Sequence, residues 1–258
     1  MKGPPVSKPF LVVSDLHLGA VPDSTEASFR RFLDWTGESA SGLLINGDLF
    51  EFGIAYQSVV PTKHYRVLAK LADLVEAGMP VYFTGGNHDR LEWGGHALAD
   101  LGVTLLEDRT VMDLAGRRTL ITHGETACQR PPIEQGLGRN RFFVALMRSI
   151  HPDWIARIQP YTTSTRRQLE RLAAGLDGGP KTHAVEIETW AQEALRKDPS
   201  LDLVVAGHSH LPAEVEVEPG RYYLNAGDWI SHFTYLEIAA ASPPFLREWT
   251  GTSGSVPP

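Results

Sequence analysis

The sequence has almost no cysteine: Cys128 is the only one among 258 residues. A single thiol cannot form an intramolecular disulfide, which excludes the bridged framework of many small secreted domains. Cys128 also lies outside every polar motif described below. We therefore expect it to be an ordinary half-buried thiol.

Long apolar runs are absent as well. The apolar stretches are a handful of residues long, whereas a membrane-spanning helix needs about 20 apolar residues. The residues before Phe10 lack the apolar centre of a secretory signal. These absences predict a cytoplasmic protein, and the length predicts one main domain over residues 1–258 with a single substantial core.

The sequence also lacks an overall excess of positive charge. The formal net charge is −7, which disfavours a protein whose whole surface binds nucleic acid phosphates. We expect no nucleic acid partner. The charge is uneven, however, because eight arginines and only three acidic residues lie between Cys128 and Arg171.

Strand-like and helix-like segments alternate in the first part of the chain. Residues 10–13, 43–45 and 81–83 are continuous apolar runs of the kind found in buried strands. Residues 23–37 and 64–77 repeat apolar side chains at helical spacing. This order is typical of an α/β sheet with crossover helices, in which ligands bind at the carboxyl ends of the strands.

The rest of the chain predicts a second sheet and a helical insertion. A second, more antiparallel sheet packed on the first would contain the short β-like stretches 103–106, 110–114, 118–121, 203–206, 214–217, 221–224 and 233–238. Residues 126–198 read as a mostly helical insertion over the active site, since connections usually have ~4–6 residues. Residues 251–258 have little to bury and are expected to be a disordered tail.

Five short segments set metal-binding side chains beside small, turn-forming residues, mostly where the apolar runs end. They are Ser14-Asp15-Leu16-His17-Leu18-Gly19, Asn46-Gly47-Asp48, Gly86-Asn87-His88-Asp89, Thr122-His123-Gly124-Glu125 and Gly207-His208-Ser209-His210. Carboxylate and imidazole ligands suit Mn, Fe, Zn or Co. Any one segment could hold a satisfied core histidine or a capping aspartate. Five together are costly to bury unpaired, and they indicate a metal site.

The spacing predicts two ions. Asp15 and His17 are two residues apart and would point to the same side of an extended backbone. Asp48, on a Gly-Asp turn, is the candidate bridge between ions roughly 3.5–4 Å apart. Asn87 would add an oxygen without another charge. Two cations of this kind lower the pKa of a bridging water, which then attacks phosphorus in line, so the motifs predict a phosphate-ester hydrolase.

From Asp15 to His210 the motifs D-x-H, G-D, G-N-H-D, H and G-H-x-H resemble those of the calcineurin-like metallophosphoesterase superfamily. The resemblance implies a two-sheet α/β sandwich and two divalent metal ions, Mn being the first choice. It implies that His88 contacts phosphate and assists the leaving group while Asp89 orients its imidazole. It assigns one ion to Asp15, His17, Asp48 and His210, and the other to Asp48, Asn87, His123 and His208.

Further details are similar to one branch, the UDP-2,3-diacylglucosamine diphosphatases of lipid A synthesis. They are Ser14 to Gly19, the run Gly47-Asp48-Leu49-Phe50-Glu51-Phe52, the arginine-rich insertion, and Gly227-Asp228-Trp229. This resemblance implies pyrophosphate hydrolysis of a nucleotide-linked glycolipid with release of UMP. Its substrate-binding candidates are Arg90, Arg130, Arg139 and Arg141, which suit bidentate contacts with phosphate.

The apolar side chains of the insertion could line an acyl groove or contact the inner membrane face. They are Phe142, Phe143, Leu146, Met147, Trp154, Ile155 and Ile158. Equally, these side chains could form the insertion's own core, with its arginines on a solvated face.

One difference from the diphosphatase branch means that other substrates are also considered. That branch commonly has Arg where this chain has His88, and Arg90 comes two places later. A histidine general acid is worth more when an alkoxide leaves. This favours a broader phosphodiesterase or phosphomonoesterase acting on nucleotides or cyclic nucleotides. A catalytically silent scaffold would have lost ligands, and none is lost. The other histidines, at 64, 96, 151, 183 and 232, are expected to have ordinary roles.

Overall fold

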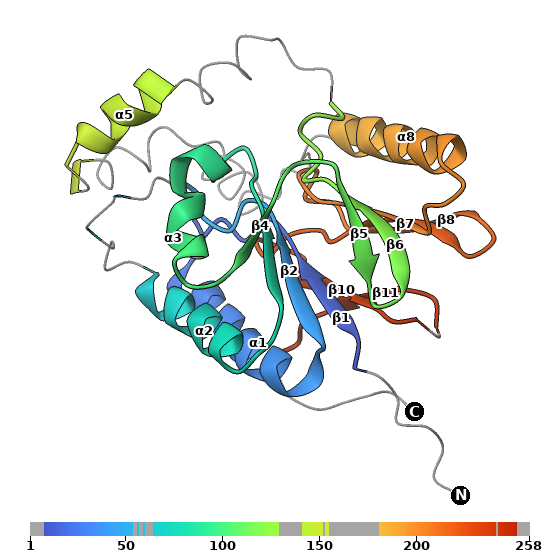
Figure 1. Ribbon diagram of the computed structural model, residues 1–258, viewed down its shortest axis with the longest axis horizontal. Helices are drawn as coiled ribbons and strands as arrows, with labels where there is room; N and C mark the ends of the chain where they lie inside the picture. The colour runs from blue at the N-terminus through green and yellow to red at the C-terminus, as the bar shows by residue number, and fades with distance from the viewer. Residues whose placement is uncertain are drawn as a thin grey trace, which may run out of the picture.

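Two β-sheets pack face to face in the computed structural model, with helices on their outer sides (Figure 1). The structure describes residues 8–53, 56, 59, 64–128, 141–151, 153–154, 181–240 and 242–251. The first sheet has the order β11-β10-β1-β2-β3-β4. Its strands are β1 (Phe10–Val13), β2 (Gly42–Asn46), β3 (Val81–Thr84), β4 (Thr104–Leu106), β10 (Thr234–Ile238) and β11 (Phe245–Glu248).

In the first sheet, β1 to β4 run parallel, while β10 is antiparallel to β1 and β11 is antiparallel to β10. The second sheet has the order β5-β6-β7-β9-β8, with β6, β7 and β9 parallel and an antiparallel strand at each edge. Its strands are β5 (Thr110–Leu114), β6 (Arg117–Ile121), β7 (Leu203–Ala206), β8 (Ala213–Glu218) and β9 (Arg221–Asn225).

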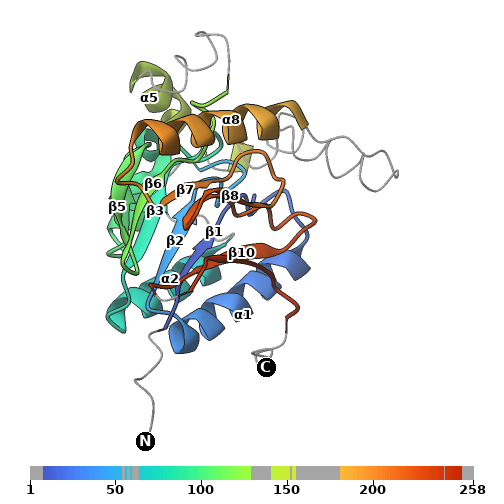
Figure 2. The ribbon, with the colours of Figure 1, turned by 90° about the vertical axis from the view of Figure 1, so that its right-hand side faces the viewer.

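Helices form the outer layers, as Figure 2 shows with α1 and α2 on one side of the sheets and α8 on the other. The long ones are α1 (Asp23–Ser39), α2 (Tyr65–Glu76) and α8 (Lys181–Lys197). A π-helical turn, η1 (Leu91–Gly95), leads into the short α3 (His96–Ala99), and α5 (Arg141–Ser149) lies against η1 through Arg148.

The central strands β1 and β7 are apolar throughout because both of their faces are buried. On β1, Leu11 and Val13 belong to the core cluster beneath α1, which contains Phe29 and Phe32. Phe10 and Val12 belong to the cluster between the two sheets, with Leu203 and Val205 of β7 opposite. Alternate side chains of one strand thus serve two cores, which explains the continuous runs in the sequence.

The two-sheet α/β sandwich is confirmed, but two strands were assigned to the wrong sheet. Residues 103–106 and 233–238 were expected in the second sheet, whereas β4 pairs parallel with β3 and β10 pairs with β1. The second sheet is mixed, with two antiparallel and two parallel pairings. Apolar alternation identifies a strand but not its partner, because pairing depends on the path of the connections.

The insertion and the tail are described only in part. Within 126–198 the structure describes helices α5 and α8, and it leaves 129–140, 152 and 155–180 outside the described residues. Of the tail 251–258, only Gly251 is described. The single-domain organisation, the cap over the active site and the disordered tail stay predictions.

Candidate metal centre

The loops that follow five strands bring six of the seven predicted ligand residues close together, and the seventh, Asn87, lies next to His88 in the loop after β3. Three of these loops follow strands β1, β2 and β3 of the first sheet. The other two loops follow strands β6 and β7 of the second sheet. Three groups have ligand atoms within 4.8 Å of one another: Asp15, His17 and His210; His17, Asp48 and His88; and Asp48, His123 and His208. His17 and Asp48 each belong to two groups, so the clusters form one continuous site.

The backbone at this site is in the left-handed region. Positive φ angles occur at Asp15 (53°), His17 (49°), Asp48 (53°), His208 (64°) and His210 (59°). Non-glycine residues adopt this conformation at a cost, and it concentrates at functional sites. The expectation that Asp15 and His17 share a side of an extended backbone is therefore wrong. They converge because the loop turns there, not because a strand continues.

Hydrogen bonds fix the orientation of two histidine rings. His17 Nδ1 lies 2.7 Å from Glu51 Oε2, and His123 Nδ1 lies 2.8 Å from the Asn46 carbonyl oxygen. A carboxylate or carbonyl oxygen only accepts, so Nδ1 carries a proton, and Nε2 is the atom that would supply a lone pair to a metal. Metal-binding histidines are commonly held this way by their other ring nitrogen.

The Nε2 atoms face the two aspartates. His210 Nε2 lies 3.4 Å from Asp15 Oδ1, and the Nε2 atoms of His17 and His123 lie 3.7 and 3.3 Å from Asp48 Oδ2. These separations suit ligands arranged around an ion. Within the described chain, Asp15 Oδ1, Asn87 Oδ1 and His123 Nε2 are buried without a hydrogen-bond partner. Buried atoms of this kind are costly, so the donor set fits divalent cations.

The ionisable groups at the site shift one another's pKa values. Burial opposes the charge on Asp48, but His123 and His88 hold the pKa of that carboxyl well below its usual range. Burial likewise disfavours the imidazolium of His17, yet hydrogen bonds with Asp15 and Glu51 raise its pKa to about 10. The pKa of His123 is raised well above the usual value against burial, mainly by the charge of Asp48. The site is thus strongly attractive to positive charge.

Asp89 does not have the position expected of it. Its carboxylate accepts the backbone N–H groups of Asp48 (2.9 Å), Phe50 (3.0 Å) and Gly86 (3.1 Å). It therefore ties the loop after β3 to the loop after β2. The His88 ring instead donates from Nδ1 to the Glu51 carbonyl oxygen at 3.1 Å, so Glu51 orients both His17 and His88.

Sequence reasoning missed Glu51 and Asp228 as parts of the site. Asp228 is fully buried, and its Oδ2 lies 3.4 Å from His210 Nδ1. Burial opposes its ionisation, but hydrogen bonds with His210 and His232 keep the pKa below the usual range. Both residues stand in runs quoted for the branch resemblance, which was the available signal. His183, expected to have an ordinary role, lies next to His208 with the ring centroids 5.5 Å apart.

Of the four arginines predicted to bind substrate, the structure describes the side chain of Arg90 alone. Arg90 Nη1 forms an ion pair with Glu125 Oε1 at 3.1 Å, and both side chains are largely buried. Arg130 and Arg139 lie outside the described residues, and Arg141 begins α5 with its side chain undescribed. Across the described ranges, no helix is both long and apolar enough to cross a membrane.

The amino-acid sequence is similar to a known protein family and to individual known proteins. The model of the family "Calcineurin-like phosphoesterase" matches residues 8–212. A UDP-2,3-diacylglucosamine hydrolase of Ralstonia nicotianae is 32% identical over 87% of this chain and 85% of that protein. One of Enterobacter sp. (strain 638) is 30% identical over 92% of this chain and 98% of that protein.

Among solved structures, the phosphoesterase Yfce of E. coli aligns over 94% of this chain and all of that chain, with 15% identity and a TM-score of 0.43. The family match spans most of the chain and includes every strand-end loop of the candidate centre. The protein thus belongs to the calcineurin-like phosphoesterase family and is a metal-dependent phosphoesterase.

Proposed function

We propose that this protein hydrolyses the pyrophosphate bond of UDP-2,3-diacylglucosamine and releases UMP, using two divalent ions that are Mn²⁺ in the cell. Support for the substrate comes from the relatives named UDP-2,3-diacylglucosamine hydrolase, which are similar over nearly their whole length. The observation that carries the chemistry is the convergence of three histidine Nε2 atoms on Asp15 and Asp48.

The residues of the site have two roles, metal binding and orientation of the metal-binding histidines. Asp15, His17, Asp48 and His210 would hold one ion, and Asp48, Asn87, His123 and His208 the other. When bound, the ions supply Lewis acidity that activates water and offsets charge on the phosphate oxygens. Glu51 and Asp228 keep the imidazoles turned toward the site.

His88 acts at the leaving group. Its Nδ1–H is committed to the Glu51 carbonyl oxygen, which leaves Nε2 for the departing phosphate oxygen. In the reaction, the P–O bond to the bridging oxygen breaks and the oxygen of water bonds to the attacked phosphorus. One proton of water remains on or near that phosphate, and the other reaches the departing oxygen with help from His88.

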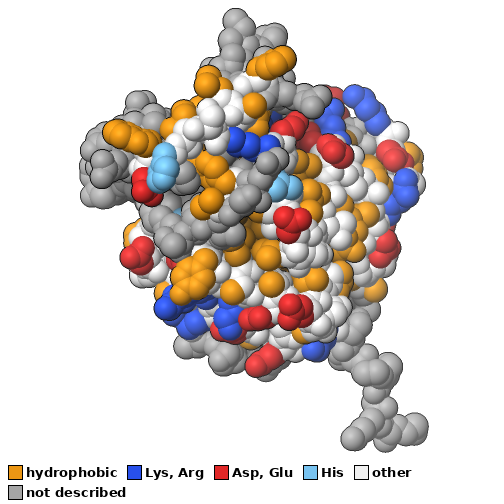
Figure 3. Space-filling view, turned by 60° about the vertical axis from the view of Figure 1, so that its left-hand side comes forward, with side chains coloured by type: hydrophobic (Ala, Val, Ile, Leu, Met, Phe, Trp, Pro, Cys, Tyr) orange, Lys and Arg blue, Asp and Glu red, His pale blue; other side chains and the backbone are white. Residues whose placement is uncertain are grey.

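Substrate binding involves the arginines and α5. We assign Arg90, Arg130, Arg139 and Arg141 to the diphosphate. Two side chains on α5, Phe142 and Leu146, are 88% and 63% exposed, and Trp154 nearby is 63% exposed. Figure 3, which brings the side of the molecule that carries α5 forward, shows hydrophobic side chains at the surface there. Such groups suit acyl chains and peripheral contact with the cytoplasmic face of a membrane.

The test is turnover by Mn-reconstituted protein of UDP-2,3-diacylglucosamine and of bis-p-nitrophenyl phosphate. We expect UMP release with a kcat/KM far above that for the simple diester. Reversing the charge at Arg139 and Arg141 should raise KM for the glycolipid and leave the diester unaffected. Turnover of the diester alone would retain the metal chemistry and reject the glycolipid, while equal effects of the arginine changes would reject their role.

A second candidate is a phosphodiesterase or phosphomonoesterase for nucleotides, and one observation favours it. The His88 ring is held beside the metal ligands by its hydrogen bond to the Glu51 carbonyl oxygen, and a histidine general acid matters most when an alkoxide leaves. Comparing 2′,3′-cyclic nucleotides and nucleoside monophosphates with the glycolipid under the same conditions distinguishes the two. Faster turnover of a nucleotide would replace the first proposal.

A further inference from the structure

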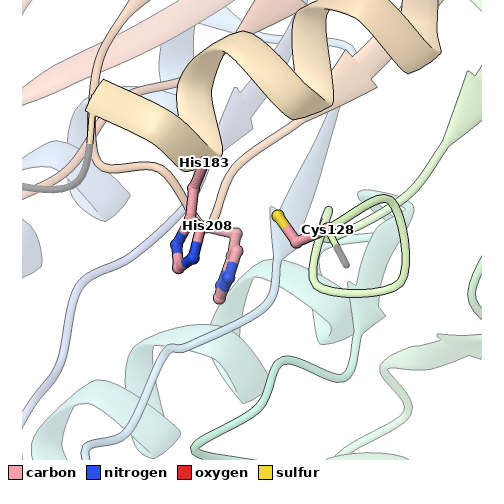
Figure 4. A group of neighbouring side chains, drawn as sticks. All are labelled: Cys128, His183 and His208. Carbon is pink, nitrogen blue, oxygen red and sulfur yellow. The ribbon is translucent and has the colours of Figure 1, made fainter. Parts of the chain in front are cut away.

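A second cluster of metal-binding side chains lies beside the candidate centre. Cys128, His183 and His208 each offer a ligand atom, and these atoms lie within 4.8 Å of one another. Figure 4 shows the three side chains converging from separate segments: the loop beyond β6, the start of α8 and the loop after β7. Only His208 belongs to the predicted dinuclear centre.

The chemistry of this cluster differs from that of its neighbour. A thiolate with two imidazoles is a soft to borderline donor set, which zinc sites of proteins commonly use. The dinuclear centre instead offers the oxygens of Asp15, Asp48 and Asn87, which suit Mn²⁺ better. The two sites therefore prefer different ions although they share a histidine.

The three side chains are positioned by packed structure. Cys128 is 4% exposed, more buried than its sequence predicted, and its Sγ lies 3.7 Å from the carbonyl oxygen of Gly124, the neighbour of His123. His183 lies one turn before Ile187, which is fully buried against the second sheet. Both donors therefore stand on anchored backbone.

The spacing of the three donor atoms, within 4.8 Å of one another, approaches that of a zinc site. Ligands at the corners of a tetrahedral zinc site are about 3.3–3.8 Å apart, from bond lengths of about 2.0–2.3 Å. The rings of His183 and His208 are now stacked, with 19° between their planes. Completing such a site would require the His183 ring to rotate about its Cβ–Cγ bond, and this side chain is only partly buried.

We propose that Cys128, His183 and His208 bind a thiophilic divalent cation, such as Zn²⁺, at a site that shares His208 with the dinuclear centre. An ion bound there withdraws His208 from the second ion of that centre. Zinc is then an inhibitor of the Mn-dependent enzyme. This regulatory consequence rests on the proposed function, whereas cation binding by the cluster does not.

The binding test uses Cd²⁺ as a spectroscopic probe on the Mn-loaded protein. Cys128 is the only cysteine, so an ultraviolet thiolate-to-Cd²⁺ charge-transfer band reports this site alone. We expect one such ion per chain, no band in Cys128→Ser, and affinity at least about tenfold weaker in His183→Gln. His151→Gln is the matched control, because His151 is well exposed and lies outside the cluster.

Absence of the band in the native protein, or an unchanged affinity in His183→Gln, would overturn the site. Near-identical circular dichroism and melting temperature of the variants verify that they fold. Inhibition is then measured on Mn-dependent hydrolysis of bis-p-nitrophenyl phosphate. We expect the Zn²⁺ concentration for half inhibition to rise at least about tenfold in both variants.

Equal inhibition of the native protein and the variants would refute the sharing of His208. Lack of any turnover before zinc is added would instead count against the proposed function, and the Cd²⁺ band would still decide the site.

Discussion

Asp48 lies where the ligand clusters meet, and its carboxylate is almost fully buried. Its Oδ2 faces His17 and His123, while its Oδ1 accepts the backbone N–H of His88 at 2.9 Å. Oδ2 is therefore the oxygen placed for metal binding, whereas Oδ1 holds the backbone of the loop after β3. Asp48→Ala should abolish turnover and reduce bound Mn at both positions, because the shared ligand is lost.

Metal content by atomic emission, beside activity, checks this outcome. Asp73→Ala on the exposed side of α2 is the control and should keep both ions. Two ions per chain in Asp48→Ala would contradict the bridging role.

His88→Gln separates leaving-group chemistry from metal binding. We expect esters with poor leaving groups to slow by roughly 10²–10⁴-fold, the contribution of a positioned general acid, while metal content is kept. Aryl phosphates with good leaving groups should slow far less. The measurement is kcat across a series of leaving-group pKa values, and a uniform loss over the series would refute the assignment.

Metal binding should release protons. In the metal-free site the raised pKa values of His17 (about 10) and His123 leave both rings protonated at pH 7. Asp15 and Asp48, with lowered pKa values, are already charged and release none. Mn²⁺ needs the imidazole lone pairs, so its affinity should fall as the pH is lowered below the pKa of about 10 of His17, and this fall should continue through pH 7.

Calorimetric titrations with Mn²⁺ in buffers of different ionisation enthalpy give the number of protons released. More than one per chain is expected. A heat of binding that is independent of the buffer would show that the histidines are neutral before the metal arrives.

The candidate ligands could be picked out from the sequence more readily than the geometry that brings them together. Residue type and local turn chemistry marked Asp15, Asp48 and His123 in the sequence. The left-handed backbone at Asp15 and the contact between Glu51 and His88 were not predictable, because both depend on loops from different strands meeting. His183 was overlooked for the same reason: nothing near it in the chain signals its distant partners.

At the scale of elements, α5 exposes apolar side chains while Arg148 on the same helix donates to the Glu92 and Trp93 carbonyl oxygens at 3.1 and 3.0 Å. The helix is thus attached to η1, while Phe142 and Leu146 are largely exposed to solvent. Phe142→Ser combined with Leu146→Ser should reduce binding to anionic lipid vesicles severalfold, since each buried apolar group adds to membrane affinity.

Vesicle flotation measures this binding. Val185→Ser on α8 is a matched control, because Val185 is as exposed as Leu146, 63% in each case. Equal flotation of all variants would remove α5 from membrane contact, and undiminished turnover of the glycolipid would remove it from acyl recognition.

The helices and most strands were predictable because their apolar periodicity is local. The prediction for 23–37 matches α1, and the one for 64–77 matches α2. The π-helical turn η1, α3 and β11 were not predicted. Gly94 and Gly95 interrupt the helical pattern of the first two. Strand β11 is a short edge strand of mixed apolar and charged residues, with Phe245 and Glu248 exposed.

At the scale of the whole molecule, the candidate centre joins the two sheets. Asp15, Asp48 and Asn87 follow strands of the first sheet, whereas His123 and His208 follow strands of the second. Ions that bind only this folded arrangement must stabilise it by linkage. Free Mn²⁺ at 100 times its dissociation constant should add about 2.7 kcal/mol per site to the free energy of unfolding.

Thermal unfolding with increasing Mn²⁺, starting from chelator-treated protein, measures the gain. The melting temperature should rise steadily with the ion in the native protein and only slightly in Asp48→Ala. A melting temperature insensitive to Mn²⁺ would mean that the ions bind without coupling to the fold.

The position of β1 has a consequence for biosynthesis. This strand lies in the middle of the first sheet, between β2 and β10, and β10 is near the other end of the chain. A chain emerging from the ribosome therefore exposes one edge of its first strand until residue 238 has been made. Contacts so distant in sequence slow folding and favour aggregation, so the nascent protein should depend on chaperones until synthesis is almost complete.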